Sequence, residues 1–253
     1  MEQRVAWVVG GVTGLGVPVI KMLAQEGYSI VSNYRKSDQA ARELEHELSL
    51  QGVESLFLRG DVSRYEEVQQ MIVQVMEHFG RVDVLVCTAG PFTFRPVATI
   101  DHSYDHWRQM LDGNLSSVFW LTSELIPGMR ERAWGRVITF GFRQVEQVPA
   151  SVGFGPYAAA KTGLVSLTRT LAEEEAKHGI TVNMICPGDI RHPFKEGTIR
   201  EAKQAREKNS VRPGSGEDIA RVVQFLVHPN SDYLSGMIIP VTGGFSPVYF
   251  PVE

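Results

Sequence analysis

Short apolar runs alternate with amphipathic stretches along the whole chain. The runs are rich in β-branched residues, as strands buried on both faces of a parallel sheet should be. We expect seven such strands, at residues 4–10, 28–34, 54–62, 82–90, 136–142, 180–188 and 236–244. Between them, positions such as Val17, Ile20 and Leu23 form apolar stripes at helical spacing. This alternation predicts an α/β fold: a doubly wound, seven-stranded parallel sheet with helices on both faces, folded as one domain over residues 1–253.

Composition and charge narrow the class of protein. The chain has 253 residues, 43% of them hydrophobic and 21% charged, which is ordinary for a globular protein. A net charge of −4 and a pI near 6.0 argue against nucleic acid as a partner. No apolar run is long enough for a membrane span, and the first residues lack the features of a signal peptide, so we expect a cytoplasmic protein that does not bind membranes. Cys87 and Cys186 stand far apart without a neighbouring His or Cys, which predicts buried free thiols and no metal site.

The first crossover carries three glycines, Gly10, Gly14 and Gly16, between a predicted strand and a predicted helix. Glycines let the backbone turn sharply and let a pyrophosphate approach the N–H groups at the positive end of the helix. A tight strand-to-helix turn could need the same residues. At the first strand of an alternating chain, the pattern predicts a dinucleotide-binding loop in a Rossmann-type sheet. The expected cofactor contacts here are Gly10, Val12, Thr13, Gly14, Leu15 and Gly16.

The second strand ends in Asn33 and Tyr34, followed by Arg35 and Lys36, with no carboxylate before Asp38. An acidic side chain at this point usually holds a free ribose 2′-hydroxyl, whereas a 2′-phosphate is held by arginine. A solvated basic turn would show the same residues. Because of its position in the fold, the segment favours NADP(H) as the cofactor.

Two further strand ends lie where an open parallel sheet presents its binding crevice. The third expected strand ends in Asp61 and Val62, and the fourth in Thr88, Ala89 and Gly90. We count all five as cofactor-binding candidates. Asp61 could instead cap the helix that follows it.

Tyr157 and Lys161 are four residues apart at the start of a predicted helix, so their side chains share one helical face. A nearby cation favours the phenolate form, and we therefore expect Lys161 to lower the pKa of Tyr157. Such a pair is suited to proton transfer.

Together these segments resemble the short-chain dehydrogenase/reductase family, from residue 4 to about 244, and within it the β-ketoacyl carrier-protein reductases most of all. The resemblance rests on the glycine loop, Asp61-Val62, Ala89-Gly90, Asn114, Tyr157, Lys161, Pro187-Gly188 and Gly243-Gly244. It implies that Tyr157 donates a proton to a carbonyl oxygen, that Lys161 lowers its pKa and binds the nicotinamide ribose, and that Asn114 holds a water in the proton relay. It also implies cofactor contacts from Pro187, Gly188 and Ile190. A buried structural role for Asn114, or for Tyr157 as a helix-start aromatic, is the alternative.

The chain also departs from the family's pattern. The family usually has a threonine where this chain has Val9 and two asparagines where it has Cys87-Thr88. It often has a threonine after Pro187-Gly188, where this chain has His192. The substrate-orienting serine aligns with Phe142, which has no hydrogen-bond donor.

Counting back from Tyr157 by the family's usual interval gives Gln144 in place of this serine. We name Gln144 as the candidate catalytic donor, ahead of Thr139, Ser151 and His192. Losing one such donor lowers turnover by roughly 10²- to 10³-fold.

Two functions remain open. The first is an NADPH-dependent oxidoreductase that reduces a ketone or aldehyde, such as a 3-oxoacyl thioester, to an alcohol. The second is an NADP(H)-binding protein with little or no catalytic activity. Residues 191–215 match the family's mobile substrate lid and carry seven Lys or Arg against three Glu. This charge would suit an anionic or carrier-bound substrate, although a solvated amphipathic helix explains it equally well.

Large apolar residues on two expected helices suggest self-association. The helices near 114–129 and 157–178 carry more large apolar residues than are needed to cover one face of the sheet. Phe119, Trp120 and Leu125 are examples. In the family these helices build a subunit interface, so we expect a homotetramer or homodimer. The aromatic C-terminal tail, residues 245–253, is expected at a subunit boundary.

Overall fold

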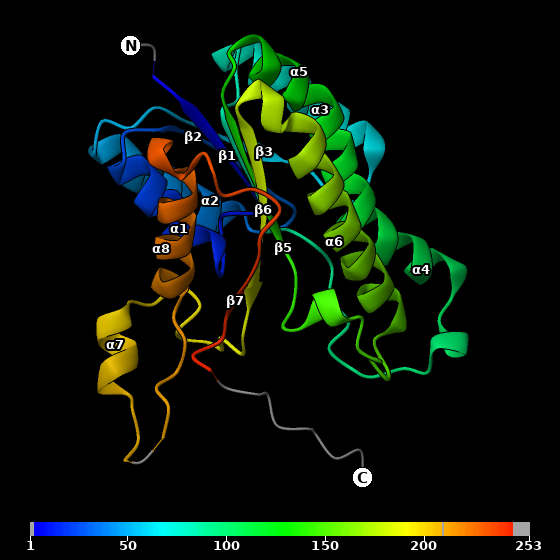
Figure 1. Cartoon of the computed structure of the whole chain (residues 1–253). Helices are drawn as coiled ribbons and strands as arrows, with labels where there is room; N and C mark the ends of the chain where they lie inside the picture. The colour runs from blue at the N-terminus through cyan, green and yellow to red at the C-terminus, as the bar shows by residue number, and fades with distance from the viewer. Residues whose placement is uncertain (1–2, 209, 245–253) are drawn as a thin grey trace.

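A parallel sheet of seven strands forms the centre of the molecule (Figure 1). The structure is a computed structural model that describes residues 3–208 and 210–244. The strands are β1 (Val5–Val9), β2 (Ser29–Tyr34), β3 (Ser55–Arg59), β4 (Val84–Cys87), β5 (Gly135–Phe140), β6 (Ile180–Pro187) and β7 (Ile238–Val241). Their order across the sheet is β3-β2-β1-β4-β5-β6-β7, with every neighbouring pair parallel. The predicted fold class is therefore confirmed.

Each observed strand is shorter than the apolar run that predicted it. The fourth run, for example, was expected to extend to Gly90, but the strand ends at Cys87. The next residues leave the ladder because Thr88 and Ala89 bond back to the end of β1. The residues that follow directly after a strand are as apolar as the strand itself. The hydrophobic pattern therefore does not show at which residue the strand ends.

Helices cover both faces of the sheet, and Figure 1 shows α3, α5 and α6 on one side and α1, α2 and α8 on the other. The helices are α1 (Gly16–Gln25), α2 (Asp38–Leu50), α3 (Tyr65–Phe79), α4 (Tyr104–Leu111), α5 (Ser117–Glu131), α6 (Gly155–Glu175), α7 (Ile199–Gln204) and α8 (Gly216–Val227). Shorter turns include η2 (Asp112–Ser116), a π-helical turn between α4 and α5, and η3 (Val145–Gln147) after β5. Within the described residues, no helix is both long enough and apolar enough to span a membrane.

Strand β1 shows why the sheet needs cover on both faces. Val5, Trp7 and Val9 pack into the core beneath α3, α5 and α6, whereas Ala6 and Val8 pack into the core beneath α1 and α8. Successive side chains of a strand point to opposite faces, so a continuous apolar run serves two cores at once.

The carboxyl ends of all seven strands lie at one edge of the sheet because the strands are parallel. The chain leaves β1 toward β2 on one side and later returns to place β4 on the other side of β1. Such a reversal of strand order opens a crevice between the loops after β1 and β4. The predicted role of residues 245–253 lies outside the described residues.

Candidate active site

The loop after β1 brings backbone N–H groups to this crevice. Helix α1 begins at Gly16, and the loop before it turns through Gly10 at a φ of 72°. A Cβ at Gly10 would lie 2.6 Å from the Cβ of Ala89, so only glycine permits the close approach of the two strand ends. The loop thus presents backbone N–H groups ahead of α1, and their use for an anion stays a prediction.

Asn33 holds this loop in place. Its Oδ1 accepts hydrogen bonds from the backbone N–H of Gly10 (3.1 Å) and from Nε1 of Trp7 (3.4 Å), and its Nδ2 donates to the carbonyl of Gly60 (3.3 Å). The side chain is 2% exposed and engaged at both ends. Asn33 therefore acts as a positioning residue for the loop, and its predicted contact with a cofactor stays a prediction.

A cavity of about 170 Å³ lies between the ends of β1, β2, β3 and β4. Its lining residues are Gly10, Asn33, Tyr34, Arg35, Gly60, Asp61, Val62, Ser63, Ala89, Gly90 and Pro91. Most of the residues predicted from the first four strand ends thus meet at one place. Gly60, Ser63 and Pro91 were missed, and only their adjacency to predicted residues could have indicated them.

Arg35 and Asp61 face each other across this cavity, with Nη1 of Arg35 at 3.3 Å from Oδ2 of Asp61. Burial alone would raise the pKa of Asp61, but hydrogen bonds from Ser63 and Arg35 outweigh it and hold the pKa below its usual value. Asp61 does not cap α3, whose N-cap residue is Arg64. It accepts instead from the N–H (2.9 Å) and Oγ (2.7 Å) of Ser63 and so shapes the turn before that helix.

The end of β4 is tied to the end of β1. Oγ1 of Thr88 donates to the carbonyl of Val9 (2.7 Å), and the N–H of Ala89 donates to the same oxygen (2.9 Å). A Cβ at Gly90 would lie 2.2 Å from Oδ1 of Asn114, so glycine is needed where the loop passes this side chain. These contacts bring Asn114 to the crevice although it is distant in sequence.

Asn114 sits in the π-helical turn η2 and is 1% exposed. Its Nδ2 donates to the carbonyls of Pro91 (2.9 Å) and Met110 (3.1 Å). Its Oδ1 has no hydrogen-bond partner among residues 3–208 and 210–244. Buried acceptors are nearly always satisfied, so this oxygen is suited to a water or ligand hydrogen in the crevice.

Lys161 and Tyr157 lie on one face of α6, as predicted. Nζ of Lys161 donates to the carbonyl of Phe140 at the end of β5 (2.8 Å) and lies 5.8 Å from the ring centroid of Tyr157. Burial lowers the pKa of Lys161 to about 8. Burial, with a smaller contribution from Cys186, raises the pKa of Tyr157 to about 12.

The net pKa of Tyr157 is therefore raised by burial and not lowered, and the contribution of Lys161 to the phenolate stays a prediction. The ammonium is directed at a backbone carbonyl, and loss of solvent around the phenol outweighs any attraction between the two groups. At neutral pH the pair consists of a protonated amine and a neutral phenol. A neutral phenol is the form that can donate a proton.

Phe142 stands beside the phenol. Its ring centroid lies 5.8 Å from that of Tyr157. Gln144 is exposed, in a left-handed conformation with φ of 60°, and no side-chain hydrogen bond joins it to Tyr157 in the described part of the chain. Thr139 is fully buried and shares a hydrogen bond with Thr168 (2.8 Å), which leaves it no access to the crevice. The role of Gln144 as the replacing donor stays a prediction.

The segment after β6 leads into the predicted lid. The N–H of Gly188 donates to the carbonyl of Val241 (2.9 Å), and Ile190 is buried against the sheet. Pro187, Gly188 and Ile190 thereby fix where residues 191–215 begin. The cofactor contacts that the resemblance implied for these three residues stay a prediction.

The lid touches the glycine loop directly. Oε1 of Glu196 accepts from the backbone N–H of Gly14 at 2.6 Å, across 182 positions of sequence. Gly216, at the start of α8, donates to the carbonyl of Phe194 (2.8 Å) and anchors the lid's base. The Glu196 carboxylate thus accepts a hydrogen bond from an N–H group that we expected to bind a pyrophosphate. Nothing in the residue pattern indicated this contact.

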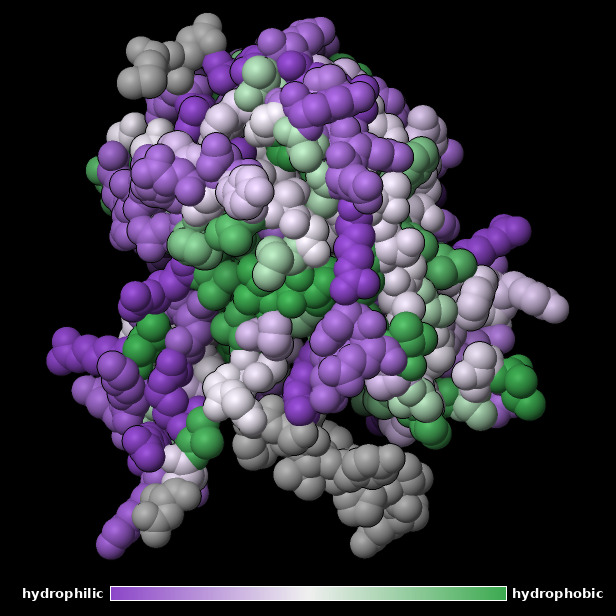
Figure 2. All heavy atoms as spheres, viewed as in Figure 1, coloured by the Kyte–Doolittle hydropathy of each residue, from purple (hydrophilic) through white to green (hydrophobic). Residues whose placement is uncertain are grey.

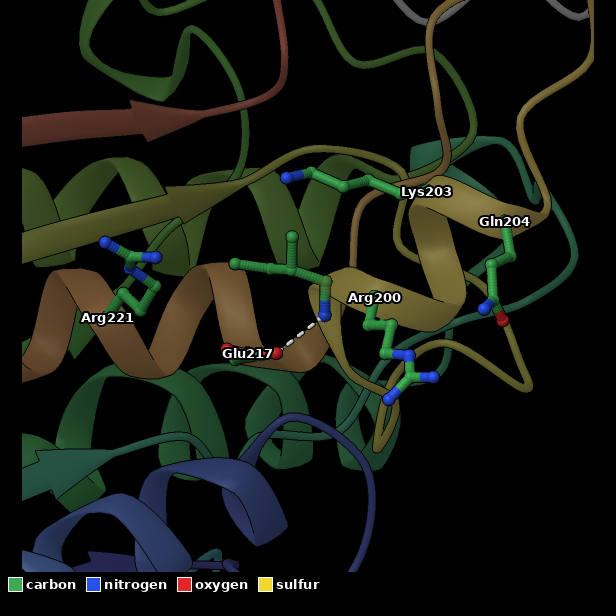
Figure 3. A pocket seen from close by; sticks show the side chains of 6 residues that line it. Arg200, Lys203, Gln204, Glu217 and Arg221 are labelled. Atoms are coloured by element: carbon green, nitrogen blue, oxygen red, sulfur yellow. Dashed lines mark hydrogen bonds between the residues drawn. The ribbon is translucent and has the colours of Figure 1, made fainter.

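Two of the lid's basic residues, Arg200 and Lys203, lie on α7 and line one hollow with Arg221 of α8. A hollow of about 490 Å³ separates α7 from α8, and Figure 3 shows Arg200 and Lys203 pointing to opposite sides of α7, with Arg221 on α8. Glu217 lies between the helices and accepts from the N–H of Ile199 (2.6 Å). This arrangement favours a solvated basic surface over a single anion site.

Cys87 and Cys186 are buried free thiols, as predicted. Burial raises the pKa of each thiol to about 12. Among the residues that the structure describes, no group of three or more His, Cys, Asp or Glu is placed to hold a metal ion.

Comparison with known proteins places the chain among oxidoreductases. Residues 10–246 match the family model described as enoyl-(acyl carrier protein) reductase. YtkK of Bacillus subtilis (strain 168), named as an oxidoreductase, is 42% identical over 96% of this chain and 97% of its own. A Bacillus thuringiensis structure named as a 3-oxoacyl-reductase is 39% identical, with a TM-score of 0.93, covering 98% of this chain and all of its own. A blue fluorescent protein from a metagenomic library, solved in complex with NADPH, is 28% identical with a TM-score of 0.83, covering 96% and 98%.

The Glu196 contact predicts competition with the cofactor. Replacing Glu196→Ala should tighten NADP(H) binding by about 3- to 10-fold, because one exposed charged hydrogen bond no longer has to be displaced by the pyrophosphate. The dissociation constant is measured by fluorescence titration in the wild type and the variant. Glu207→Ala, which removes another exposed lid carboxylate, is the matched control. An unchanged or weaker affinity in Glu196→Ala contradicts the competition.

Proposed function

Because the chain belongs to the short-chain dehydrogenase/reductase family, we propose that it is an NADPH-dependent reductase that converts a ketone or aldehyde to an alcohol. The observation that carries this proposal is the charge state of the pair on α6. Below pH 8 the buried Lys161 is an ammonium, and far above that pH Tyr157 is still a neutral phenol. The site therefore keeps a proton donor beside a cation at the edge of the crevice.

A nicotinamide cofactor, when bound, would supply the hydride for the carbonyl carbon. Tyr157 donates its phenolic proton to the carbonyl oxygen. Lys161 stabilises the negative charge that develops on the phenol oxygen, because an ammonium less than 6 Å from the ring favours that form. Asn114 offers its unpartnered Oδ1 to a water that returns a proton to the phenol.

Arg35 supports NADPH as the cofactor. It lines the cavity at the end of β2, its side chain is 53% exposed, and its present partner is Asp61 at 3.3 Å. A 2′-phosphate carries more charge than one carboxylate and accepts two parallel N–H bonds from a guanidinium. Lys36 follows it and is exposed, with no ion pair in the described part of the chain.

Among carbonyl compounds, a 3-oxoacyl thioester is one candidate substrate, since the similar Bacillus thuringiensis protein is named as a 3-oxoacyl-reductase. Phe142 favours a second candidate function, an NADP(H)-binding protein with little catalysis. Its ring lies 5.8 Å from that of Tyr157, and it aligns in sequence with the serine that orients the substrate in the family.

We also propose that the chain forms a homotetramer or homodimer. Phe119 on α5 is 55% exposed, and Trp107 on α4 is 39% exposed. Apart from these two residues, Figure 2 shows an apolar area in the middle of the viewed face, at the height of β7 in Figure 1. Phe225, on the neighbouring α8, is 57% exposed. Exposed apolar surface at two separate places is typical of interfaces between subunits.

Replacing Tyr157→Phe tests the reductase most simply. It should lower the turnover number for NADPH-driven carbonyl reduction by at least about 10²-fold, since a positioned acid contributes 10²- to 10⁴-fold. NADPH affinity should stay within about twofold. Tyr233→Phe, at a tyrosine that is 99% exposed, is the matched control. Full turnover in Tyr157→Phe would show that the proton comes from another group.

The pKa of Lys161 predicts the pH profile of the reduction. The ammonium is present below about pH 8 and is lost as the pH rises through that value, while Tyr157 remains protonated up to about 12. The specificity constant kcat/KM should therefore be flat below pH 8 and fall in one step centred near 8. Steady-state rates from pH 6 to 10 at saturating NADPH check this. A profile that stays flat to pH 10 excludes a titrating Lys161 from the mechanism.

Arg35 predicts the cofactor preference. NADPH should bind more tightly than NADH, and Arg35→Asp should weaken NADPH by about 10- to 100-fold, as expected for losing hydrogen bonds between charged groups. Binding of NADH should change little. Arg42→Asp, on the exposed surface of α2, makes the same charge change away from the cavity. Equal affinities of the wild type for the two cofactors refute the assignment.

Light scattering at micromolar concentration tests the assembly. The expected mass is two or four times 28.2 kDa. Phe119→Glu should reduce it, because burial of an unpaired charge at an interface is unfavourable. A monomeric wild type refutes the proposal.

A further inference from the structure

Four phenylalanines from three loops form one aromatic cluster with Tyr157. Phe92 contacts the Tyr157 ring edge to face, with centroids 5.0 Å apart, and stacks on Phe154 at 5.7 Å with an 11° angle between the rings. Phe94 meets Phe92 edge to face at 5.2 Å, and the ring of Phe142 is tilted against that of Tyr157 with centroids 5.8 Å apart. We call Phe92, Phe94, Phe142 and Phe154 the aromatic wall.

The loops that carry the wall are fixed to one another. The N–H of Val97, after β4, donates to the carbonyl of Gly153, before α6, at 3.0 Å. Gly153 has a φ of 82°, and a Cβ there would lie 2.4 Å from the Cβ of Pro96. Thr93 shares a hydrogen bond with His106 on α4 (3.1 Å). The wall is therefore held in place before any ligand arrives.

The wall is also only partly buried. Phe92 is 44% exposed and Phe94 is 85% exposed, although each lies within contact distance of other rings. A purely structural cluster would bury these rings in the core. Rings that are fixed, stacked and open to solvent beside the proton donor instead present flat apolar faces to the substrate.

The two residues of β5 and its following loop nearest to this place offer no free hydroxyl. Phe142 brings a ring, not a hydroxyl, to the phenol, and Thr139, within β5, is buried in a hydrogen bond with Thr168. Contacts between the wall and a ring on the substrate can position the carbonyl in place of a second hydrogen bond. Stacked and edge-to-face contacts are directional, so they can orient as well as bind.

We propose that the substrate of this site is a carbonyl compound whose C=O is attached to a flat aromatic or conjugated group, which packs against Phe92 and Phe142. This rests on the proposed reductase function. The step transfers a hydride from NADPH to the carbonyl carbon and a proton from Tyr157 to the oxygen, giving the alcohol and NADP⁺. The phenol then regains a proton from solvent.

A matched pair of ketones tests the proposal. Phenyl methyl ketone and cyclohexyl methyl ketone have the same carbon skeleton, but only the first has a flat ring. Conjugation makes the phenyl ketone the less electrophilic of the two, so any preference for it must come from the site. We expect the wild type to favour the phenyl ketone by about 10-fold in kcat/KM, the size of one to two aromatic contacts.

Three variants assign that preference to the wall. Phe92→Leu and Phe142→Leu keep apolar bulk but remove the ring, and each should reduce the preference to about threefold or less. Phe225→Leu on α8 should leave it unchanged. NADPH affinity should stay constant in all three. A wild type that reduces both ketones equally, or a preference that survives both wall variants, overturns the proposal while leaving the reductase function intact.

Direct binding separates the two proposals if neither ketone is reduced. Ligand-observed NMR with the phenyl ketone, in the presence of NADP⁺, reports occupancy without turnover. Binding that weakens in Phe92→Leu but not in Phe225→Leu supports the aromatic site and overturns the reductase. Absence of binding to the wild type overturns the aromatic site itself.

Discussion

A buried ammonium group at the end of β5 is the constraint on which the rest of the site depends. Lys161 is 5% exposed, and its Nζ is held by the carbonyl of Phe140 at 2.8 Å. Burying a cation is unfavourable, as its lowered pKa shows. The same hydrogen bond joins α6 to the sheet edge and so fixes where Tyr157 stands. The position of the phenol and the charge beside it are thus set by one interaction.

The parallel sheet explains how residues far apart in the sequence reach that position. Gly10, Arg35, Asp61 and Ala89 each follow a different strand, and the parallel arrangement places all four at one edge. This much is predictable from the sequence, because strand ends can be read from apolar runs and their common edge follows from strand–helix alternation. The helical spacing of Tyr157 and Lys161 is predictable for the same reason.

Other features depend on side-chain geometry that no periodicity encodes. Asn33 was expected to contact the cofactor, but its hydrogen bonds to Gly10 and Gly60, which hold the glycine loop in place, could not be predicted from its position in the sequence. The contact of Glu196 with the glycine loop depends on the path of the lid, which the residue pattern does not encode. We expected a lowered pKa for Tyr157, whereas the pKa is raised. Sequence spacing reveals a nearby cation but does not reveal how much solvent the phenol loses.

The central claim is that burial leaves a neutral phenol beside an ammonium that titrates near pH 8. NMR of the protein labelled with ¹³C at lysine Cε measures it directly, with Lys161→Met used to assign the resonance. The structure predicts that the Lys161 resonance titrates with a midpoint near 8. A midpoint near the ordinary value of 10.5 would contradict it, since Lys161 would then be solvated and the charge state of the site would not be set by burial.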